Sequence, residues 1–156
     1  LIMGVIGDPS RMDAAIVSDT VNSASRMEGL CKHYGARIVI SGTTFQRLSI
    51  TSEISWRGLG KVRVKGKEDV LEVYDVYEAD LPEVRKLKDE TKELFTKALE
   101  YYQIGRFEEA TSYFARVLSA YPEDKAAQVY LNKSIQYQSL GHVPETWSGI
   151  EEMSIK

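Results

Sequence analysis

The stretch SDTVNSASRMEGL, residues 18–30 of this 156-residue chain, contains two polar side chains at helical spacing. Its Asn22 and Arg26 lie four residues apart, so on a helix both side chains project from the same face. Two interpretations are open for such a pair. Asn22 can hydrogen-bond to the backbone while Arg26 pairs with a carboxylate such as Asp19 or Glu28, or both side chains can face a ligand. The rest of the sequence has to decide between them.

The ends of this helix are marked by residues with known capping preferences. Ser18 or Asp19 can cap its start, and Gly35, after Tyr34, is expected to end it in the left-handed conformation. Apolar side chains recur at helical spacing and predict the face that packs on the core. These residues are Val21, Ala24, Met27, Cys31 and Tyr34.

Residues 1–79 alternate short strand-like runs with short helices, which predicts an α+β fold. The predicted strands are LIMGVIG (1–7), RIVIS (37–41), SEISWRG (52–58), GKVRVKG (60–66) and VLEVYDVYEA (70–79), with a short helix at GTTFQRL (42–48). Within KVRVK, Val62 and Val64 point to one face and Lys61, Arg63 and Lys65 to the other. Lys65 can therefore be a solvated strand end or a contact for an anion.

From about residue 80 the apolar period changes to that of helices, and no further strand is predicted. The predicted helices are EVRKLKDETKELFTKALEYYQIG (83–105), FEEATSYFARVLSAY (107–121) and EDKAAQVYLNKSIQYQSLG (123–141). Six residues of this region fall at the spacing of a tetratricopeptide repeat: Ala98, Gly105, Phe107, Ala110, Phe114 and Pro122. The alternative is any helical hairpin with small residues where its helices cross.

The composition describes an ordinary globular protein and excludes several classes of function. The formal net charge of −3 gives no reason to expect sequence-independent binding of nucleic acid. Cys31 is the single cysteine, so no internal disulfide can form, which fits a reducing, cytoplasmic location. His33 and His142 lack metal-ligand spacing and are interpreted as packing or surface residues.

Residues 18–30 form part of a longer pattern together with the stretches on either side of them. Together with GVIGDPSRMD (4–13), YGARIVIS (34–41) and LGKVRVKGKEDVLEVYDV (59–76), the motif D-x-V-N-x-A-S-R-M-E resembles class III adenylate and guanylate cyclases. The resemblance covers residues 4–77. It implies the carboxy-terminal half of a ferredoxin-like catalytic domain over residues 1–79, followed by a tetratricopeptide-like helical tail over residues 80–156, as in some bacterial adenylate cyclases.

The resemblance also assigns roles to individual residues. In this family the ribose 3′-hydroxyl attacks the α-phosphate in line and pyrophosphate leaves. Asn22 corresponds to the residue that positions the ribose, and Arg26 to the one that stabilises charge on the α-phosphate. Lys65 corresponds to the lysine that holds the terminal phosphates. The sharing of one active site between two subunits in this family implies a homodimer.

Two departures from the family pattern limit what the chain is expected to do. The two aspartates that bind Mg²⁺ or Mn²⁺ in the family precede residue 1, so no metal ligand is expected here, and the fragment alone is expected to be inactive. The position that hydrogen-bonds the purine is Ala15, which has no polar atom, so only backbone groups such as those of Ile16 can touch the base. The preference for ATP over GTP therefore rests on resemblance alone.

The sequence thus predicts part of a nucleotide cyclase whose helical tail serves dimerisation or regulation, with any membrane anchor in preceding segments. The alternatives are a degenerate homologue that only dimerises and a tetratricopeptide-type module that binds another protein. The helices carry more apolar side chains than one hairpin can hide, and either the cyclase part or a second subunit has to cover them, with the second subunit favoured. These side chains are Leu94, Phe95, Leu99, Tyr102, Phe107, Tyr113, Phe114, Leu118, Tyr130 and Leu131.

Overall fold

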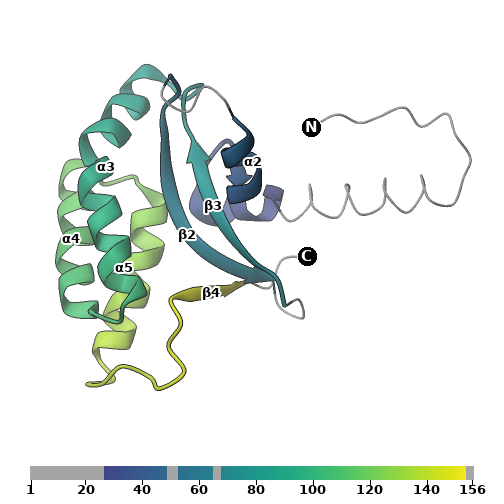
Figure 1. Cartoon of the computed structure of the whole chain (residues 1–156). Helices are drawn as coiled ribbons and strands as arrows, with labels where there is room; N and C mark the ends of the chain where they lie inside the picture. Colours follow the sequence, from purple (N-terminus) through teal and green to yellow (C-terminus); the bar gives the residue numbers. More distant parts are fainter. Residues whose placement is uncertain (1–26, 49–52, 65–67, 154–156) are drawn as a thin grey trace, which may run out of the picture.

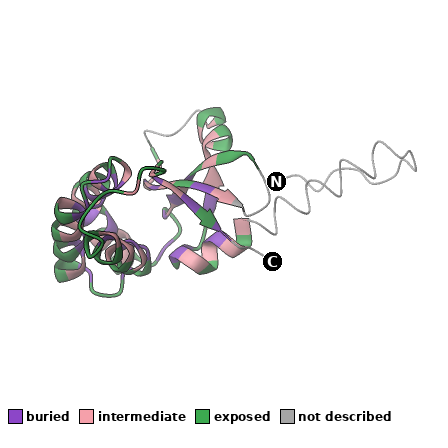
Figure 2. Cartoon of the chain, turned by 90° about the horizontal axis from the view of Figure 1, so that it is seen from below, coloured by how far each residue is buried: buried purple, intermediate pink, exposed green. Residues whose placement is uncertain are grey.

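The computed structural model describes residues 27–48, 53–64 and 68–153. Four strands form one sheet in the order β1-β3-β2-β4. Its strands are β1 (Val39–Ser41), β2 (Trp56–Val64), β3 (Val70–Val76) and β4 (Ile150–Met153). The bundle of α3 (Pro82–Gln103), α4 (Phe107–Ala120) and α5 (Lys125–Gln138) lies to one side of the strands, and the short helix α2 (Gly42–Arg47) lies to the other (Figures 1 and 2). The described part is a mixed α/β fold.

The centre of the sheet is an antiparallel hairpin of β2 and β3, whose register runs from Trp56 opposite Val76 to Arg63 opposite Val70. The sequence predicted two strands over 52–66, but β2 is continuous. Its register shifts between Gly58 and Gly60. The glycines that suggested a break between two strands therefore form a β-bulge within one strand. Gly60 has φ +105°, and a Cβ there would lie 2.6 Å from the Tyr130 hydroxyl oxygen. The bulge therefore lets α5 approach the strand.

The three long helices lie close to where the sequence predicted them: α3 (Pro82–Gln103), α4 (Phe107–Ala120) and α5 (Lys125–Gln138). Pro82 occupies the first turn of α3, where its missing N–H costs no hydrogen bond. Gly105, with φ +82°, turns the chain between α3 and α4. The Asp124 carboxylate caps α5 by accepting from the Ala127 N–H. The tetratricopeptide likeness of these helices stays a prediction.

The carboxy-terminal region is not all helical, which corrects the sequence prediction. After α5 the chain returns to the sheet, and β4 pairs in parallel with β2, from Lys61 opposite Ile150 to Val64 opposite Met153. Figure 1 shows this return from the base of the helices to the edge of the sheet. Four residues carry too weak a periodic signal to predict a strand when their partner lies far away in sequence.

The sheet and the helices share one hydrophobic core. Val62 and Val73 of the sheet belong to the same buried cluster as Phe95, Phe114 and Tyr130 of the helices. Figure 2 shows buried residues where the two parts meet and exposed ones on the outer side of the bundle. Of the ten apolar side chains listed above for the helices, six are buried within the chain: Phe95, Leu99, Tyr102, Phe107, Phe114 and Tyr130. The other four, Leu94, Tyr113, Leu118 and Leu131, are half-buried and pack against the core. The sheet therefore covers much of this surface, and its cover by a second subunit stays a prediction.

The first described helix spans residues 27–34 and ends as predicted, with Gly35 at φ +67°. Its buried side chains are Leu30 and Tyr34, while Cys31 and Met27 are half-buried and pack against the core. Leu30 was missed as a core residue. Val21 and Ala24 lie outside the described residues.

Candidate functional site

All five residues that the sequence singles out for substrate lie outside the described residues. Asn22, Arg26, Ala15 and Ile16 fall within residues 1–26, and Lys65 falls within residues 65–67. Their roles therefore stay predictions. The structure does describe the two elements that adjoin them in sequence: the helix that follows Arg26 and the strand that precedes Lys65.

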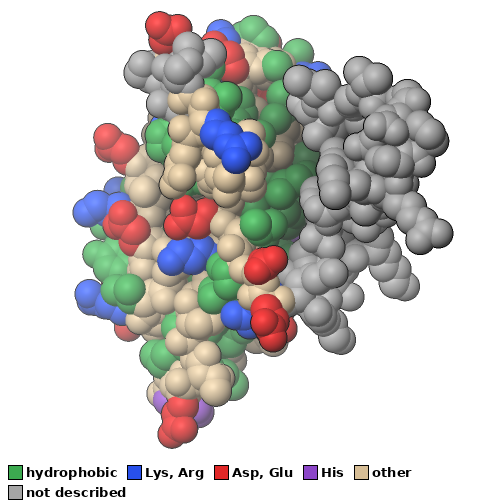
Figure 3. Space-filling view, turned by 45° about the vertical axis from the view of Figure 1, so that its right-hand side comes forward, with side chains coloured by type: hydrophobic (Ala, Val, Ile, Leu, Met, Phe, Trp, Pro, Cys, Tyr) green, Lys and Arg blue, Asp and Glu red, His purple; other side chains and the backbone are tan. Residues whose placement is uncertain are grey.

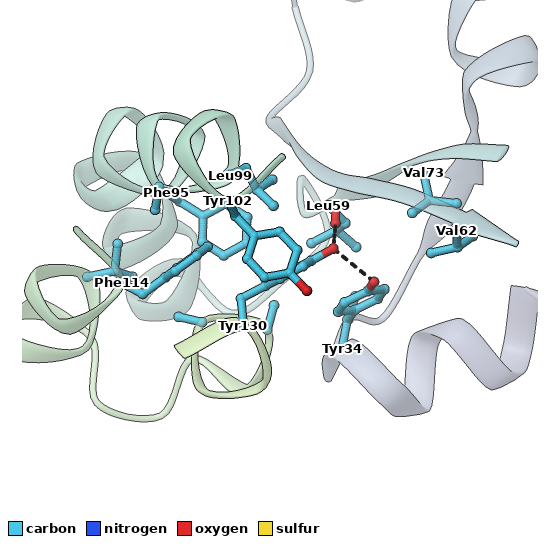
Figure 4. Close-up of a cluster of buried hydrophobic side chains, with 14 of the residues drawn as sticks. Tyr34, Leu59, Val62, Val73, Phe95, Leu99, Tyr102, Phe114 and Tyr130 are labelled. Carbon is cyan, nitrogen blue, oxygen red and sulfur yellow. Dashed lines mark hydrogen bonds between the residues drawn. The ribbon is translucent and has the colours of Figure 1, made fainter. Parts of the chain in front are cut away.

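The helix that follows Arg26 is attached to the rest of the fold by its last turn. Tyr34 is buried, and its hydroxyl lies 3.1 Å from the hydroxyl of Tyr130 on α5. Tyr130 donates its own proton to the carbonyl oxygen of Leu59, so Tyr34 is the donor to Tyr130 (Figure 4). The Lys125 Nζ also donates to the Lys32 carbonyl oxygen at 2.6 Å. Helix 27–34 is thereby joined to both α5 and β2.

Glu28, which the sequence offered as a structural partner for Arg26, pairs with Lys32 among the described residues. The Lys32 Nζ lies 3.7 Å from the Glu28 Oε1, and both side chains are largely exposed. A solvated pair four residues apart on a helix contributes little to stability.

The strand that precedes Lys65 alternates as predicted over its described side chains. Val62 is buried in the core and Lys61 is exposed. Arg63 is half-buried, and its Nη1 lies 2.9 Å from the Glu152 Oε1 on β4. The end of β2 is therefore held by β4 on one side and by β3 on the other.

A buried network of five charged side chains joins the sheet to the helices, and the sequence analysis missed it. The Arg57 guanidinium on β2 donates two hydrogen bonds to the Asp124 carboxylate, with nitrogen–oxygen distances of 2.7 and 3.0 Å. Its Nε donates to the Asp75 Oδ2 at 3.1 Å. Lys88 on α3 donates to that same oxygen at 2.9 Å and to Asp80 at 2.7 Å. All five are buried, and Arg57 is only 2% exposed.

This network pairs two cations with three carboxylates, and Asp75 Oδ1 and Asp80 Oδ1 have no hydrogen-bond partner among the described residues. Burial alone would lower the pKa of Arg57, but its hydrogen bonds to Asp124 and the charges of Asp124 and Asp75 hold that pKa above its ordinary value. The guanidinium also lies 4.5 Å from the ring centroid of Phe95. The sequence carried one sign that Arg57 is buried: strand alternation places it on the same face of the strand as Leu59. Its partners are far away in sequence and gave no signal.

The described residues also form a cleft of about 490 Å³ between β2, β3 and α3. Trp56 and Tyr74 supply aromatic walls, and the Lys92 Nζ lies 3.8 Å from a ring centroid of Trp56. Burial lowers the pKa of Lys92.

Figure 3 shows acidic and basic side chains interspersed on the face that it draws, without a patch of one sign. No predicted substrate residue is among the described residues that line this cleft.

The described residues hold neither a metal-binding cluster nor a membrane-spanning helix. No group of three or more His, Cys, Asp or Glu side chains there could hold a metal ion. In the same residues, no helix has the length and apolar character that crossing a membrane requires. His33 is half-buried, and its Nε2 has no hydrogen-bond partner there; burial lowers its pKa. His142 is exposed, and its Nδ1 lies 3.0 Å from the Leu140 carbonyl oxygen.

Comparison with known proteins gives the class of the first region. Residues 1–77 match the family model described as the adenylate and guanylate cyclase catalytic domain. Together with the relatives below, this match supports a class III nucleotide cyclase domain. The match covers the residues in which the motif D-x-V-N-x-A-S-R-M-E lies.

Three curated relatives are adenylate cyclases by name. The chain is 42% identical over 77 residues to the adenylate cyclase of Anabaena cylindrica, covering 49% of this chain and 15% of that protein. It is 33% identical over 75 residues to adenylate cyclase 1 of Rhizobium meliloti (strain 1021), covering 48% of this chain and 11% of that protein. It is 33% identical over 136 residues to the terminal-differentiation-specific adenylate cyclase of Dictyostelium discoideum, covering 86% of this chain and 6% of that protein.

These matches differ in how far they extend. The chain spans only between 6% and 15% of the length of these relatives. The match to the Dictyostelium protein is longer than residues 1–77 and therefore includes part of the helical region. No solved structure matches the chain.

Proposed function

We propose that this chain is the carboxy-terminal half of a cyclase domain that converts ATP, in preference to GTP, to the 3′,5′-cyclic nucleotide and pyrophosphate. The observation that carries the proposal is the match of residues 1–77 to the cyclase family model over the residues that contain Asn22 and Arg26. The choice of ATP is supported by the names of the relatives, all adenylate cyclases.

In the proposed reaction the ribose 3′-oxygen forms a bond to the α-phosphorus, the bond from the α-phosphorus to the bridging oxygen breaks so that pyrophosphate leaves, and the 3′-hydroxyl proton passes to solvent. Asn22 positions the ribose for this in-line attack. Arg26 stabilises the charge that grows on the α-phosphate, for which a planar, permanently charged guanidinium is suited. Lys65 holds the terminal phosphates, and the backbone of Ile16 together with Ala15 lies against the purine.

The proposal includes a homodimer in which each active site takes residues from both subunits. Its support is the family resemblance, because the sheet already buries most of the apolar side chains that the helices carry. We assign the helical region a regulatory role, supported by its shared core and charge network with the sheet. Mg²⁺ or Mn²⁺ would neutralise phosphate charge in the intact enzyme, held by residues outside this chain.

The test compares the full-length protein with the isolated 156-residue chain. We expect the full-length protein to form cyclic AMP from ATP with Mg²⁺ or Mn²⁺, and the isolated chain to form none from ATP or GTP. Chromatographic detection of cyclic nucleotide and pyrophosphate measures both. Full-length protein without activity would favour a degenerate homologue, and activity of the isolated chain would contradict the assignment of the metal ligands to another segment.

Selectivity for the base can be tested at Ala15. We expect Ala15→Thr in the full-length protein to raise the ratio of kcat/KM for ATP to that for GTP by several-fold, because one buried hydrogen bond is worth about 0.5–1.5 kcal/mol. Ala15→Val adds the same bulk without a hydroxyl and serves as the control. An equal ratio in wild type and both variants would show that this position does not contact the base.

A further inference from the structure

The chain after α5 makes an unusual set of contacts with the end of α3. The indole Nε1 of Trp147 donates to the carbonyl oxygens of Tyr102 and Gln103, at 3.2 and 3.1 Å, and so satisfies carbonyls at the carboxyl end of α3. Gly149 then has φ +73°, and a Cβ there would lie 2.9 Å from the Gln103 carbonyl oxygen. This turn directs the following residues to the edge of the sheet.

The strand that follows, β4, is fastened by a buried carboxylate. Glu151 is 3% exposed, and each of its oxygens has its own partner. Its Oε1 accepts from the Tyr102 hydroxyl at 2.6 Å, and its Oε2 lies 3.2 Å from the Lys133 Nζ on α5. A buried carboxylate is stable only when paired and hydrogen-bonded, so Glu151 locks β4 to α3 and α5 together.

The pairing of β4 with β2 connects the Glu151 contacts to the proposed substrate site. β4 pairs with the last four residues of β2, and its final pair joins Met153 to Val64. The next residue along the chain is Lys65, the proposed phosphate-binding residue. Arg63 adds a side-chain tie to Glu152 at the same end. A displacement of the helices would thus act on the strand end from which Lys65 follows.

We propose that β4, locked to α3 and α5 through Glu151, positions the end of β2 and thereby Lys65 for the terminal phosphates of the nucleotide. Glu151 and Tyr102 are positioning residues in this scheme. The helical region then belongs to the substrate site instead of serving only as an appended module. The proposal rests on the phosphate-binding role proposed for Lys65.

Tyr102→Phe is the first test variant, because it removes the hydroxyl bound to Glu151 and keeps the ring in the aromatic cluster with Phe107 and Trp147. Glu151→Gln is the second, and it replaces the carboxylate facing Lys133 by an amide. The matched control is Tyr113→Phe on α4, whose hydroxyl makes no hydrogen bond within the described residues. All three variants are made in the full-length protein.

Two measurements are made on each variant. Hydrogen exchange of the backbone amides in residues 60–64 and 150–153 should be faster in Tyr102→Phe and Glu151→Gln, and unchanged in Tyr113→Phe. The KM for ATP should rise about twofold to tenfold in the two test variants, the range expected for the loss of one hydrogen bond, with a smaller change in kcat. In a Lys65→Ala background the test variants should add no further increase in KM.

Three outcomes overturn the proposal at different steps. Exchange equal to that of Tyr113→Phe in both test variants shows that Glu151 does not hold the end of β2. Faster exchange with an unchanged KM, while Lys65→Ala raises KM, shows that the held strand does not position Lys65. An unchanged KM in Lys65→Ala itself, which leaves the contacts of Glu151 intact, identifies a failure of the proposed function of Lys65.

Discussion

Replacing Arg57 by methionine should cost about 3–5 kcal/mol of unfolding free energy, because it leaves the buried Asp124 carboxylate without its cation and leaves Asp75 with only Lys88, which Asp75 shares with Asp80. Methionine keeps most of the volume against Phe95, so the loss reports the charge and not a cavity. Denaturant unfolding of the chain, followed by circular dichroism, measures the change. A loss of this size would leave a domain of ordinary stability barely folded.

The matched control is Arg63→Met, the same substitution on the same strand. Arg63 pairs with Glu152, but these side chains are 34% and 61% exposed, so we expect a loss of only about 0–1 kcal/mol. Equal losses in the two variants would contradict the view that burial makes the Arg57 network decisive. A second check is Lys88→Met, which should also be costly because Lys88 bridges Asp75 and Asp80.

The largest expected effect on activity is at Arg26. In the full-length protein, Arg26→Ala should lower kcat by about 10²–10³-fold with a much smaller change in KM, since a preorganised charge that acts on the transition state is lost. Steady-state kinetics with ATP measure both parameters. Arg26→Lys should retain part of the rate, because a lysine keeps the charge but not the planar fork.

The control for Arg26 is Lys32→Ala, which removes another basic side chain downstream in the same stretch. Lys32 is exposed and pairs only weakly with Glu28, so kcat and KM should stay at their wild-type values. An Arg26→Ala variant that changes KM alone would mean that Arg26 binds the ground state and does not stabilise the transition state.

Much of the helical region could be predicted from the sequence because its signals are local. Pro82 marks the start of α3, Gly105 turns the chain before α4, and α4 ends shortly before Pro122. Each of these residues acts through its own backbone conformation, and that effect depends only on residues that are close by in the sequence. The same holds for Gly35 at the end of helix 27–34.

The candidate site could be predicted only through a pattern of residues. Asn22 and Arg26 acquired a proposed role from the motif around them, and the match of residues 1–77 to the cyclase family supports the class of that motif. Spacing on a helix alone favoured a structural pair. Lys65 was likewise ambiguous until the residues on both sides of it were considered together.

The sequence by itself determined the helices, the alternation of β2 and the motif that resembles nucleotide cyclases, because these depend on residues close together in the chain. Only the tertiary structure decided that β4 returns to β2, that Arg57 finds Asp124, and that the helices cover the sheet. Arg57 and Asp124 are 67 residues apart, and Tyr102 and Glu151 are 49 apart. A buried charge or a four-residue strand is stable only with such a distant partner, so its place is settled by the folded chain as a whole.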